Sequence, residues 1–180
     1  MFPEILTDRL ALRDLEPSDG PRVFSYHKHP DVARFQSWAT DSVDSVQSYI
    51  RSLSTLEPGT PGGWYQVGIF LRETGKLIGD CGFRVLAAVP EQAELGITLA
   101  PEFQGHGYAT EALRALLNYL LITLEEHRVF GSVDPRNVAS MKLLERVGMR
   151  KEAHFVQSLR FRGEWVDDVV FAILASEWRS

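Results

Sequence analysis

The chain has 180 residues, 44% of them hydrophobic and 24% charged, which is the profile of a folded globular domain with a sizeable core. Its net charge of −5, with both signs interspersed and no basic run, argues against a nucleic-acid backbone as a partner. The lone cysteine excludes an internal disulfide, and neither zinc-ligand spacing nor the roughly 18 apolar residues of a membrane span occurs. We therefore expect a single cytoplasmic domain over 1–180, without a metal and without a membrane partner.

The first half of the chain is predicted to combine strands with amphipathic helices. Leucines and arginines alternate early, as in a half-buried strand, and TDSVDSVQSYIRSL opens with capping residues before apolar side chains at helical spacing. In chain order we expect a strand over 5–15, helical segments interrupted at Pro30 over 16–38, a helix over 40–53, a surface loop over 57–63, and a hairpin over 64–86 that turns at Thr74-Gly75.

The second half is predicted to continue this alternation. Leucines at helical spacing indicate one long helix over 105–126. In chain order we expect a strand over 92–100, that helix, a strand over 127–134, a helix over 139–148 with Asn137 as its cap and Gly148 at its end, and strands over 149–161 and 164–174 around Arg162-Gly163. Helices interleaved with a mostly antiparallel sheet of about seven strands make an α+β domain of three layers.

The most informative stretch is FQGHGYATEAL, 103–113, where two glycines and an alanine precede the long helix. Small residues leave backbone N–H groups unobstructed at a helix N-terminus, where the helix dipole is positive, and this favours a phosphate. The stretch is not a P-loop, because the second glycine is followed by Tyr-Ala-Thr, and it is not a dinucleotide fingerprint, because Thr110 replaces the third glycine. On this motif alone, a tight connection without a ligand stays open.

Three sets of residues stand in order on the expected elements and span nearly the whole chain. They are Gln104-x-x-Gly107-x-Ala109 between a strand and a helix, Asp134-Pro135-Arg136-Asn137-Val138-Ala139-Ser140 through Leu143-Leu144-Glu145-Arg146-Val147-Gly148-Met149, and Thr7-Asp8-Arg9-Leu10 with Leu12-Arg13 and Pro30-Asp31-Val32-Ala33-Arg34. Together they resemble the GNAT superfamily of N-acetyltransferases, and the third set resembles its branch of ribosomal-protein alanine and serine N-acetyltransferases. Met149 departs mildly from the pattern, because an aromatic residue is usual there.

The resemblance implies a three-layer α/β/α GNAT-like fold whose sheet splays open to admit acetyl-CoA. In the family, the loop that corresponds to Gln104 through Thr110, called the glycine loop below, holds the pyrophosphate. The preceding strand bonds the pantetheine arm through its backbone, and an asparagine side chain contacts that arm. Lys142 or Arg146 could meet a CoA phosphate by charge or simply be solvated. The implied cofactor-binding residues are Ile97, Leu99, Gln104, Gly105, His106, Gly107, Tyr108, Ala109, Thr110, Asn137, Ser140 and Arg146.

Acetyl transfer needs a neutral amine, and deprotonation at pH 7 costs about 1 kcal/mol for an α-amino group but about 4 to 5 kcal/mol for a lysine. Glu94, on the strand leading to the cofactor, is the candidate base, with an exposed strand charge as the alternative. His154 could relay a proton or be structural. Leu144 stands where many relatives carry a tyrosine acid. Ser140 matches the serine proposed as acid in the ribosomal branch, or it bonds backbone in the first helical turn.

The acceptor side is expected between the N-terminal helices and the last hairpin. The aromatic or polar candidates for the acceptor pocket are His27, His29, Phe35, Trp38, Trp64, Tyr65, Phe155 and Trp165, although most of these aromatic side chains are expected in the core. Trp38, after the proline break, and Phe35 are the candidate substrate-binding residues. YHKH, 26–29, is interpreted as a solvated helix end. The acceptor is an amine, either a small molecule or a peptide N-terminus, and we expect a homodimer.

Two other functions stay open from the sequence. A non-catalytic domain that binds or senses acyl-CoA would share the fold, and the missing tyrosine favours it. An interaction domain without a ligand would use the glycine loop only as a connection. Stabilisation by CoA separates the last from the first two, because a ligand that binds the folded state stabilises it by RT ln(1 + [L]/Kd).

Overall fold

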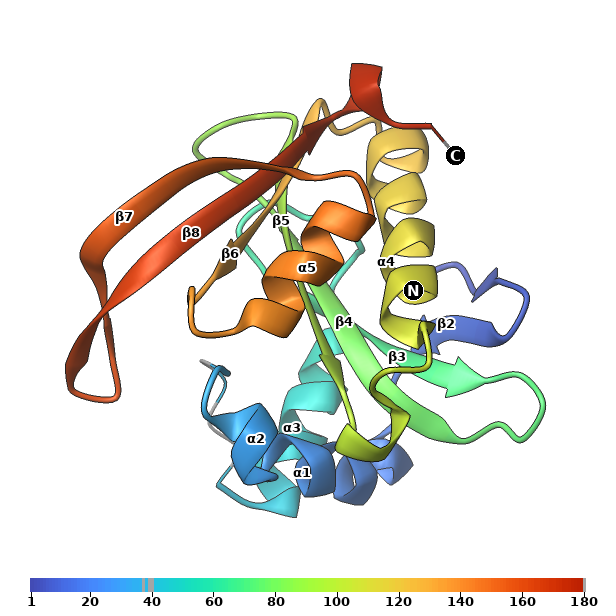
Figure 1. Ribbon diagram of the computed structural model, residues 1–180. Coiled ribbons are helices and arrows are strands. Elements are labelled where there is room, and N and C mark those ends of the chain that lie inside the picture. Colours follow the sequence, from blue (N-terminus) through green and yellow to red (C-terminus); the bar gives the residue numbers. More distant parts are fainter. Residues whose placement is uncertain (37, 39–40, 180) are drawn as a thin grey trace.

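The computed structural model describes residues 1–36, 38 and 41–179 and is built around one open sheet (Figure 1). In these residues the sheet has eight strands in the spatial order β1-β2-β3-β4-β5-β6-β8-β7. Their bounds are β1 Ile5–Leu6, β2 Leu10–Asp14, β3 Tyr65–Leu71, β4 Leu77–Val85, β5 Gln92–Leu99, β6 Arg128–Val133, β7 Arg150–Phe161 and β8 Glu164–Leu174. Every neighbouring pair is antiparallel except β5 and β6, which are parallel.

Helices cover both faces of the sheet, as the three-layer prediction requires. Their bounds are α1 Gly20–His27, α2 Pro30–Ala33, α3 Val43–Leu53, α4 Tyr108–Asn118 and α5 Val138–Arg146. On one face, Val23 of α1 and Ile50 of α3 share a core with side chains of β2 and β3. On the other face, Leu113 of α4 and Leu144 of α5 share the larger core with β3, β4, β5 and β8. The predicted α+β fold of three layers is therefore confirmed.

The predicted strand over 5–15 is wrong in one respect, because the chain forms two strands there. The backbone N–H of Thr7 donates to the carbonyl of Leu10 at 2.9 Å, and the Thr7 hydroxyl oxygen accepts the backbone N–H of Leu10 at 3.0 Å, which closes a turn between β1 and β2. This split gives eight described strands in place of the expected seven. Thr7 signals such a turn only weakly in the sequence, since its hydroxyl can bond backbone in any conformation.

The predicted helix over 105–126 is shorter than expected at both ends. Gly105 and Gly107 have φ of 79° and 83°, which a right-handed helix does not allow, so α4 begins at Tyr108. After Asn118 the chain widens into a π-helical turn, Tyr119–Thr123. Leucine spacing does not distinguish this wider turn from a continuing α-helix.

The other predicted turns and caps are confirmed by the backbone. Gly75 has φ of 68°, as a tight turn between β3 and β4 requires. The side chain of Asn137 accepts the backbone N–H of Ser140 and caps α5. At the other end of α5, the N–H groups of Gly148 and Met149 return to the carbonyls of the last turn, which is a Schellman end.

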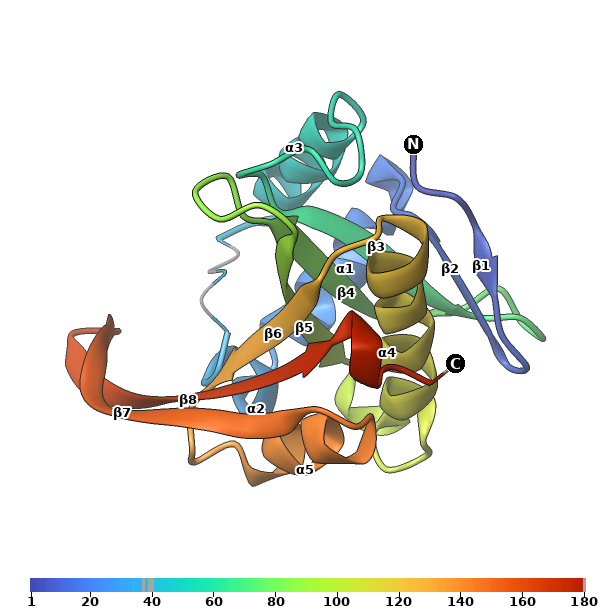
Figure 2. The ribbon, with the colours of Figure 1, turned by 90° about the horizontal axis from the view of Figure 1, so that it is seen from above.

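The single parallel contact of the sheet, between β5 and β6, is short. Pairing between β5 and β6 is confined to the first part of β5, where Gln92, Ala93 and Glu94 face Arg128, Val129 and Phe130. From there, β5 continues to Leu99 paired with β4 alone, while β6 continues paired with β8. The sheet therefore opens between two strands, and the β7–β8 hairpin reaches beyond the rest of it (Figure 2). In the described residues, no helix combines the length and apolar character needed to cross a membrane.

Candidate active site

Two cavities meet where β5 and β6 diverge. The loop cavity, about 1230 Å³, is lined by the glycine loop and the facing ends of α4 and α5. The aromatic cavity, about 690 Å³, is lined by β3, β5, β6, the N-terminal helices and the β7–β8 hairpin. Residues common to both linings are Phe35, Gln36, Ile97, Thr98, Asn137, Ser140 and Leu143. A donor and an acceptor can therefore enter from different sides and meet at the open edge of β5.

The glycine loop leaves its amides available to a ligand in the loop cavity. The first helical amide of α4 with a backbone partner is that of Glu111, which donates to Gly107 at 3.2 Å. In the described part of the chain, no residue accepts the amides of Gly105 through Thr110. A Cβ at Gly105 would meet nothing within 4 Å, so this side of the loop is open. Unpaired amides at the positive end of a helix form an anion site that suits a diphosphate.

The loop is held from outside by the turn between β1 and β2. Arg9 bonds both carboxylate oxygens of Glu111, from Nε at 2.7 Å and from its own backbone N–H at 2.8 Å. The same guanidinium donates to the carbonyl of His106 at 3.0 Å and lies 4.5 Å from the centre of the Tyr108 ring. Thr7 adds a hydrogen bond to Glu111 at 2.6 Å. These contacts hold the loop by its far side, so its amides stay free.

Glu111 lies beside the proposed anion site, so its negative charge has to be balanced by the contacts with Arg9 and Thr7. A carboxylate in the first turn of α4 would otherwise compete with an anionic ligand for the helix N-terminus. Burial alone would raise the pKa of Glu111, but hydrogen bonds from Thr7 and Arg9 outweigh burial and lower it. The Arg9 charge then balances the Glu111 charge beside the loop.

The α5 side of the loop cavity supplies positive charge and polar groups. Lys142 and Arg146 of α5 line it, Arg114 of α4 lines it from the opposite side, and Arg146 donates to the Thr110 hydroxyl at 3.5 Å. Because Asn137 uses its side-chain oxygen to cap α5, its amide nitrogen remains a donor for a ligand. The arrangement fits an extended anion whose charged end lies between α4 and α5.

The aromatic cavity has the opposite character. Its aromatic lining residues are Phe35, Trp38, Tyr49, Trp64 and Phe161. Its acidic lining residues are Glu94, Asp134, Asp167 and Asp168, against one described lysine or arginine, Arg160. An acidic cavity with aromatic walls attracts a cation such as a protonated amine.

Two of these carboxyls are held ionised by their neighbours. A hydrogen bond from Arg136 lowers the pKa of Asp134, and hydrogen bonds from the Gln157 backbone and from His154 lower the pKa of Asp167. Both therefore stay negative at neutral pH.

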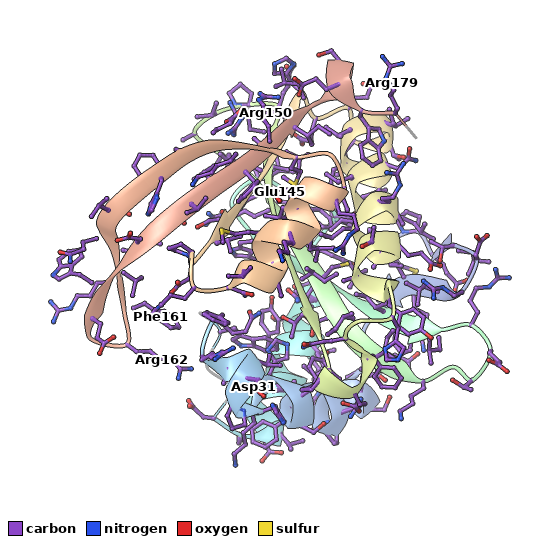
Figure 3. All side chains as sticks on the ribbon, in the orientation of Figure 1. Asp31, Glu145, Arg150, Phe161, Arg162 and Arg179 are labelled. Carbon is purple, nitrogen blue, oxygen red and sulfur yellow. The ribbon has the colours of Figure 1, made fainter. Side chains whose placement is uncertain are left out.

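Phe161 and Arg162 close the hairpin above α2 (Figure 3), where Arg162 donates to the carbonyl of Ala33 at 2.8 Å. This contact fixes the outer wall of the aromatic cavity.

The floor of the aromatic cavity is the face of β5 that carries Glu94, Gly96 and Thr98. A Cβ at Gly96 would meet nothing within 4 Å, so this glycine leaves open space above the strand. Glu94 lies at one end, where its Oε2 accepts from Arg84 at 2.5 Å. Its other oxygen faces no described donor and is able to bind an N–H group.

Most sequence-predicted site residues lie at these two cavities. Ile97, Leu99, Gln104, Gly105, Gly107, Tyr108, Ala109, Thr110, Asn137, Ser140 and Arg146 line the loop cavity, and Phe35, Trp38 and Glu94 line the aromatic cavity. Two candidates lie elsewhere. The His106 ring is exposed outside the loop cavity beside Tyr108, and His154 is exposed on β7, where its Nε2 lies 2.7 Å from Asp167. The structure thus does not bring His154 to either cavity.

A buried polar group at the aromatic cavity was predicted only in part, since His27 was a candidate for the acceptor pocket but its burial was not expected. Residues 26–29 were interpreted as solvated, which is right for Lys28 and His29 but wrong for Tyr26 and His27, at 2% and 4% exposure. Both bond the fully buried Asp80 of β4. Tyr26 lies three residues after the apolar Val23 on the inner face of α1, and this spacing is the only signal in the sequence.

Comparisons with known proteins agree with this geometry. Residues 9–150 match the family described as Acetyltransferase (GNAT) domain. The [ribosomal protein uS5]-alanine N-acetyltransferase of Escherichia coli is 30% identical over 182 residues, which cover 97% of this chain and 92% of that protein. An uncharacterised N-acetyltransferase of Bacillus licheniformis is 29% identical over 97% of both chains.

Solved structures give the same result. A GNAT-family acetyltransferase of Bacillus anthracis superposes with a TM-score of 0.85 and 26% identity over 97% of this chain and 100% of that one. A spermidine N-acetyltransferase of Vibrio cholerae shares the fold, with a TM-score of 0.77 and 22% identity over 94% of this chain and 96% of that one.

In the described part of the chain, no group of three or more His, Cys, Asp or Glu side chains could hold a metal ion.

Proposed function

The chain belongs to the GNAT acetyltransferase family, and from this membership we propose that it transfers the acetyl group of acetyl-CoA directly to a primary amine in the aromatic cavity. One observation carries the proposal. The amides of Gly105 to Thr110 have no partner among the described residues, and all of these residues except His106 line a cavity that continues along the unpaired edge of β5 into an acidic, aromatic cavity. This order of features suits a diphosphate, an extended arm with amide groups, and a cationic acceptor.

The donor is held mainly by backbone. The amides of Gly105 to Thr110 bind the pyrophosphate, and Lys142 and Arg146 balance its charge. Among the described residues, the β5 edge from Leu95 to Leu99 has no strand partner beyond β4, so its N–H and C=O groups are free to pair with the pantetheine amides. The acetyl carbon then lies where the two cavities meet.

The acceptor is a cationic amine that the carboxylates of the aromatic cavity attract. Glu94 is its first contact in the proposal, through the oxygen that Arg84 leaves free. After loss of a proton, the amine attacks the thioester carbonyl carbon, and the carbon–sulfur bond breaks. A backbone N–H of β5 near Leu99 stabilises the oxyanion, and Ser140, which lines both cavities, lies near the leaving thiolate.

A peptide α-amine is the acceptor class to examine first. Its deprotonation at pH 7 costs only about 1 kcal/mol, against about 4 to 5 kcal/mol for a lysine side chain. Polyamines and other small amines form the second class, because the acidic lining attracts any primary ammonium group.

The test combines binding with turnover. Purified protein is titrated with CoA in a thermal-shift assay, and thiol release from acetyl-CoA is then followed with peptide α-amines, polyamines and small amines. A hundredfold excess of CoA over Kd is expected to stabilise the protein by about 2.7 kcal/mol. Stabilisation without turnover on any amine points to a non-catalytic acyl-CoA binding domain, and no stabilisation overturns the assignment of the glycine loop.

A further inference from the structure

The floor of the aromatic cavity contains a row of three paired residues, two of which are glycines. Gln66 of β3 pairs with Gly82 of β4, and Gly82 pairs with Gly96 of β5. All three residues line the aromatic cavity. Because Gly82 and Gly96 lack side chains, the row leaves room for the side chain of Gln66 and, one strand further on, for a ligand.

The Gln66 side chain lies across this row. A Cβ at Gly82 would collide with Oε1 of Gln66, so the amide oxygen lies directly over Gly82. A Cβ at Gly96 would meet nothing within 4 Å, so the space above the next strand is free. Cβ positions of paired residues on neighbouring strands are about 4.5–5.5 Å apart. A nitrogen above Gly96 is therefore within reach of a hydrogen bond to Oε1.

Asp80 fixes the direction of the Gln66 amide. The side-chain N–H of Gln66 donates to Oδ1 of Asp80, while Oδ2 accepts the hydroxyl of Tyr26 and lies 2.8 Å from Nε2 of His27. Asp80 has no exposed surface, whereas Gln66 is half-buried. A carboxylate only accepts hydrogen bonds, so the amide nitrogen of Gln66 must face Asp80 and its oxygen must face away.

Oε1 of Gln66 is available to a ligand. In the described part of the chain, the hydrogen bond of this amide is made by its nitrogen, and the oxygen has no partner. The buried side-chain atoms that lack a partner there are Nδ1 of His27, Nε of Arg84 and Oε2 of Glu126. Because Oε1 is not one of them, it keeps exposed surface on the cavity side. A carbonyl oxygen held by a buried network is a preformed hydrogen-bond acceptor.

We propose that Gln66 determines the specificity of the acceptor site, and that its Oε1 accepts an N–H of the acceptor amine above Gly96. The inference rests on the proposed function. Glu94 lies two residues from Gly96 on the same face of β5, roughly 7 Å along the strand. Glu94 attracts the ammonium group by its charge, whereas Gln66 is neutral and contributes the direction of a hydrogen bond.

The place of Gln66 in the sheet sets how it orients the amine. β3 and β4 lie on the side of β5 that is opposite to its open edge. An N–H that points to Oε1 therefore points away from that edge. The lone pair of the neutral nitrogen is then directed toward the edge, where the proposed function has the thioester.

The two contacts favour a primary amine over a secondary amine. A neutral primary amine has two N–H groups, one for Gln66 and one for Glu94, whereas a neutral secondary amine has one. A site built to bind an N–H group discriminates against an analogue that lacks it, because a polar group of the protein is then left unpaired.

The test compares kcat/KM for the best primary amine from the acceptor screen with kcat/KM for its N-methyl derivative. Gln66→Met keeps the length of the side chain and removes the hydrogen-bond acceptor. Gly82→Ala puts a methyl group where the Gln66 oxygen lies and displaces the end of that flexible side chain. Each variant is expected to lower kcat/KM about tenfold for the primary amine and less for the derivative, so the preference for the primary amine narrows.

Gln92→Met is the matched control. Gln92 is a half-buried glutamine of β5 that accepts from Arg128 at 3.1 Å and lines neither cavity. This variant is expected to keep the wild-type kcat/KM for both amines. Stabilisation by CoA is expected to stay as in the wild type in all three variants, because none of the three positions lines the loop cavity.

The outcomes separate the inference from the proposed function. A wild-type chain without turnover on any amine contradicts the function itself. Turnover with an unchanged preference for the primary amine in folded Gln66→Met or Gly82→Ala overturns the role of Gln66 alone, and so does an equal loss for both amines.

A crystal structure of the wild type with CoA and the amine gives a second test that does not depend on the variants. The amine nitrogen is expected within about 3.2 Å of Oε1 of Gln66. A nitrogen that binds elsewhere in the aromatic cavity overturns the inference.

Discussion

At the scale of single residues, glycines define where ligands can lie. Gly105 and Gly107 have positive φ and turn the loop amides outward, whereas Gly96 has ordinary strand geometry and keeps the floor of the aromatic cavity open. The first two act through backbone conformation and the third through the missing side chain. Substitutions at these positions therefore affect different cavities.

Gly105→Ala is expected to weaken CoA binding about tenfold or more without changing the acceptor side. The left-handed conformation costs a residue with a Cβ roughly 1–2 kcal/mol, and relief of that strain turns the amides away from the ligand. Isothermal titration with CoA measures the change in Kd. Unchanged affinity in a folded variant contradicts the role of the loop backbone.

Gly96→Leu is expected to have the opposite effect. A leucine side chain fits the strand backbone and fills space above β5, so KM for the amine rises at least tenfold while stabilisation by CoA stays as in the wild type. Steady-state kinetics at saturating acetyl-CoA, together with the thermal-shift titration, measure both. A loss of CoA stabilisation with unchanged KM means that this face of β5 belongs to the donor.

At the scale of elements, the turn between β1 and β2 and the cap of α5 act on the loop cavity from its two sides. Arg9 and Glu111 tie the first turn of the chain to the first turn of α4, more than one hundred residues later in the sequence. Asn137 fixes where α5 begins, and the N-terminal turn of α5 lines the same cavity.

Glu111→Gln is expected to change how stability depends on pH. The folded pKa of Glu111 lies below the ordinary value of 4.5, so the wild-type carboxylate stabilises the fold above that value and loses the contribution as pH falls below it. The variant lacks this contribution at neutral pH, and its stability declines less steeply between about pH 5 and 3. Urea denaturation at several pH values measures the difference. Parallel curves for the two proteins contradict the ion-pair assignment.

Asn137→Ala and Ser42→Ala form a matched pair. Each removes a side-chain cap, from α5 and α3 respectively, and each is expected to cost about 1 kcal/mol in the free energy of unfolding. Only the first is expected to weaken CoA binding, since Ser42 is not among the residues that line the loop cavity. Equal CoA affinity in both variants means that Asn137 is a cap and nothing more.

Local sequence patterns predicted most helices and strands, because one or two turn or cap residues mark where each of them begins or ends. The turn at Gly75, the cap at Asn137 and the end at Gly148 are set by one or two residues, and the structure confirms them. The split at Thr7 was missed because it depends on a contact with the distant Glu111, and the π-helical turn after Asn118 was missed because leucine spacing does not distinguish it from a continuing α-helix. A turn that is held by Glu111 leaves little trace in the sequence around it.

At the scale of the whole molecule, the open sheet separates the proposed donor site in the loop cavity from the proposed acceptor site in the aromatic cavity. Loss of pairing between β5 and β6 creates one edge that faces an anion-binding loop and an acidic aromatic cavity at once. The loop side was predictable, because its residues are adjacent in sequence. The buried group of Tyr26, His27, Gln66 and Asp80 was not, because three elements supply it and only the folded sheet brings them together. Assembly as a homodimer stays a prediction.

The most direct test of the central claim is mass spectrometry of an amine panel incubated with acetyl-CoA, run in parallel for the wild type and Gly105→Ala. The account predicts that a primary amine gains one acetyl group while one equivalent of CoA thiol appears, and that the variant gives the same product more slowly at low acetyl-CoA concentration. Thiol release without an acetylated amine, or equal rates for both proteins at every acetyl-CoA concentration, contradicts the claim that the glycine loop delivers an acetyl donor to a nitrogen.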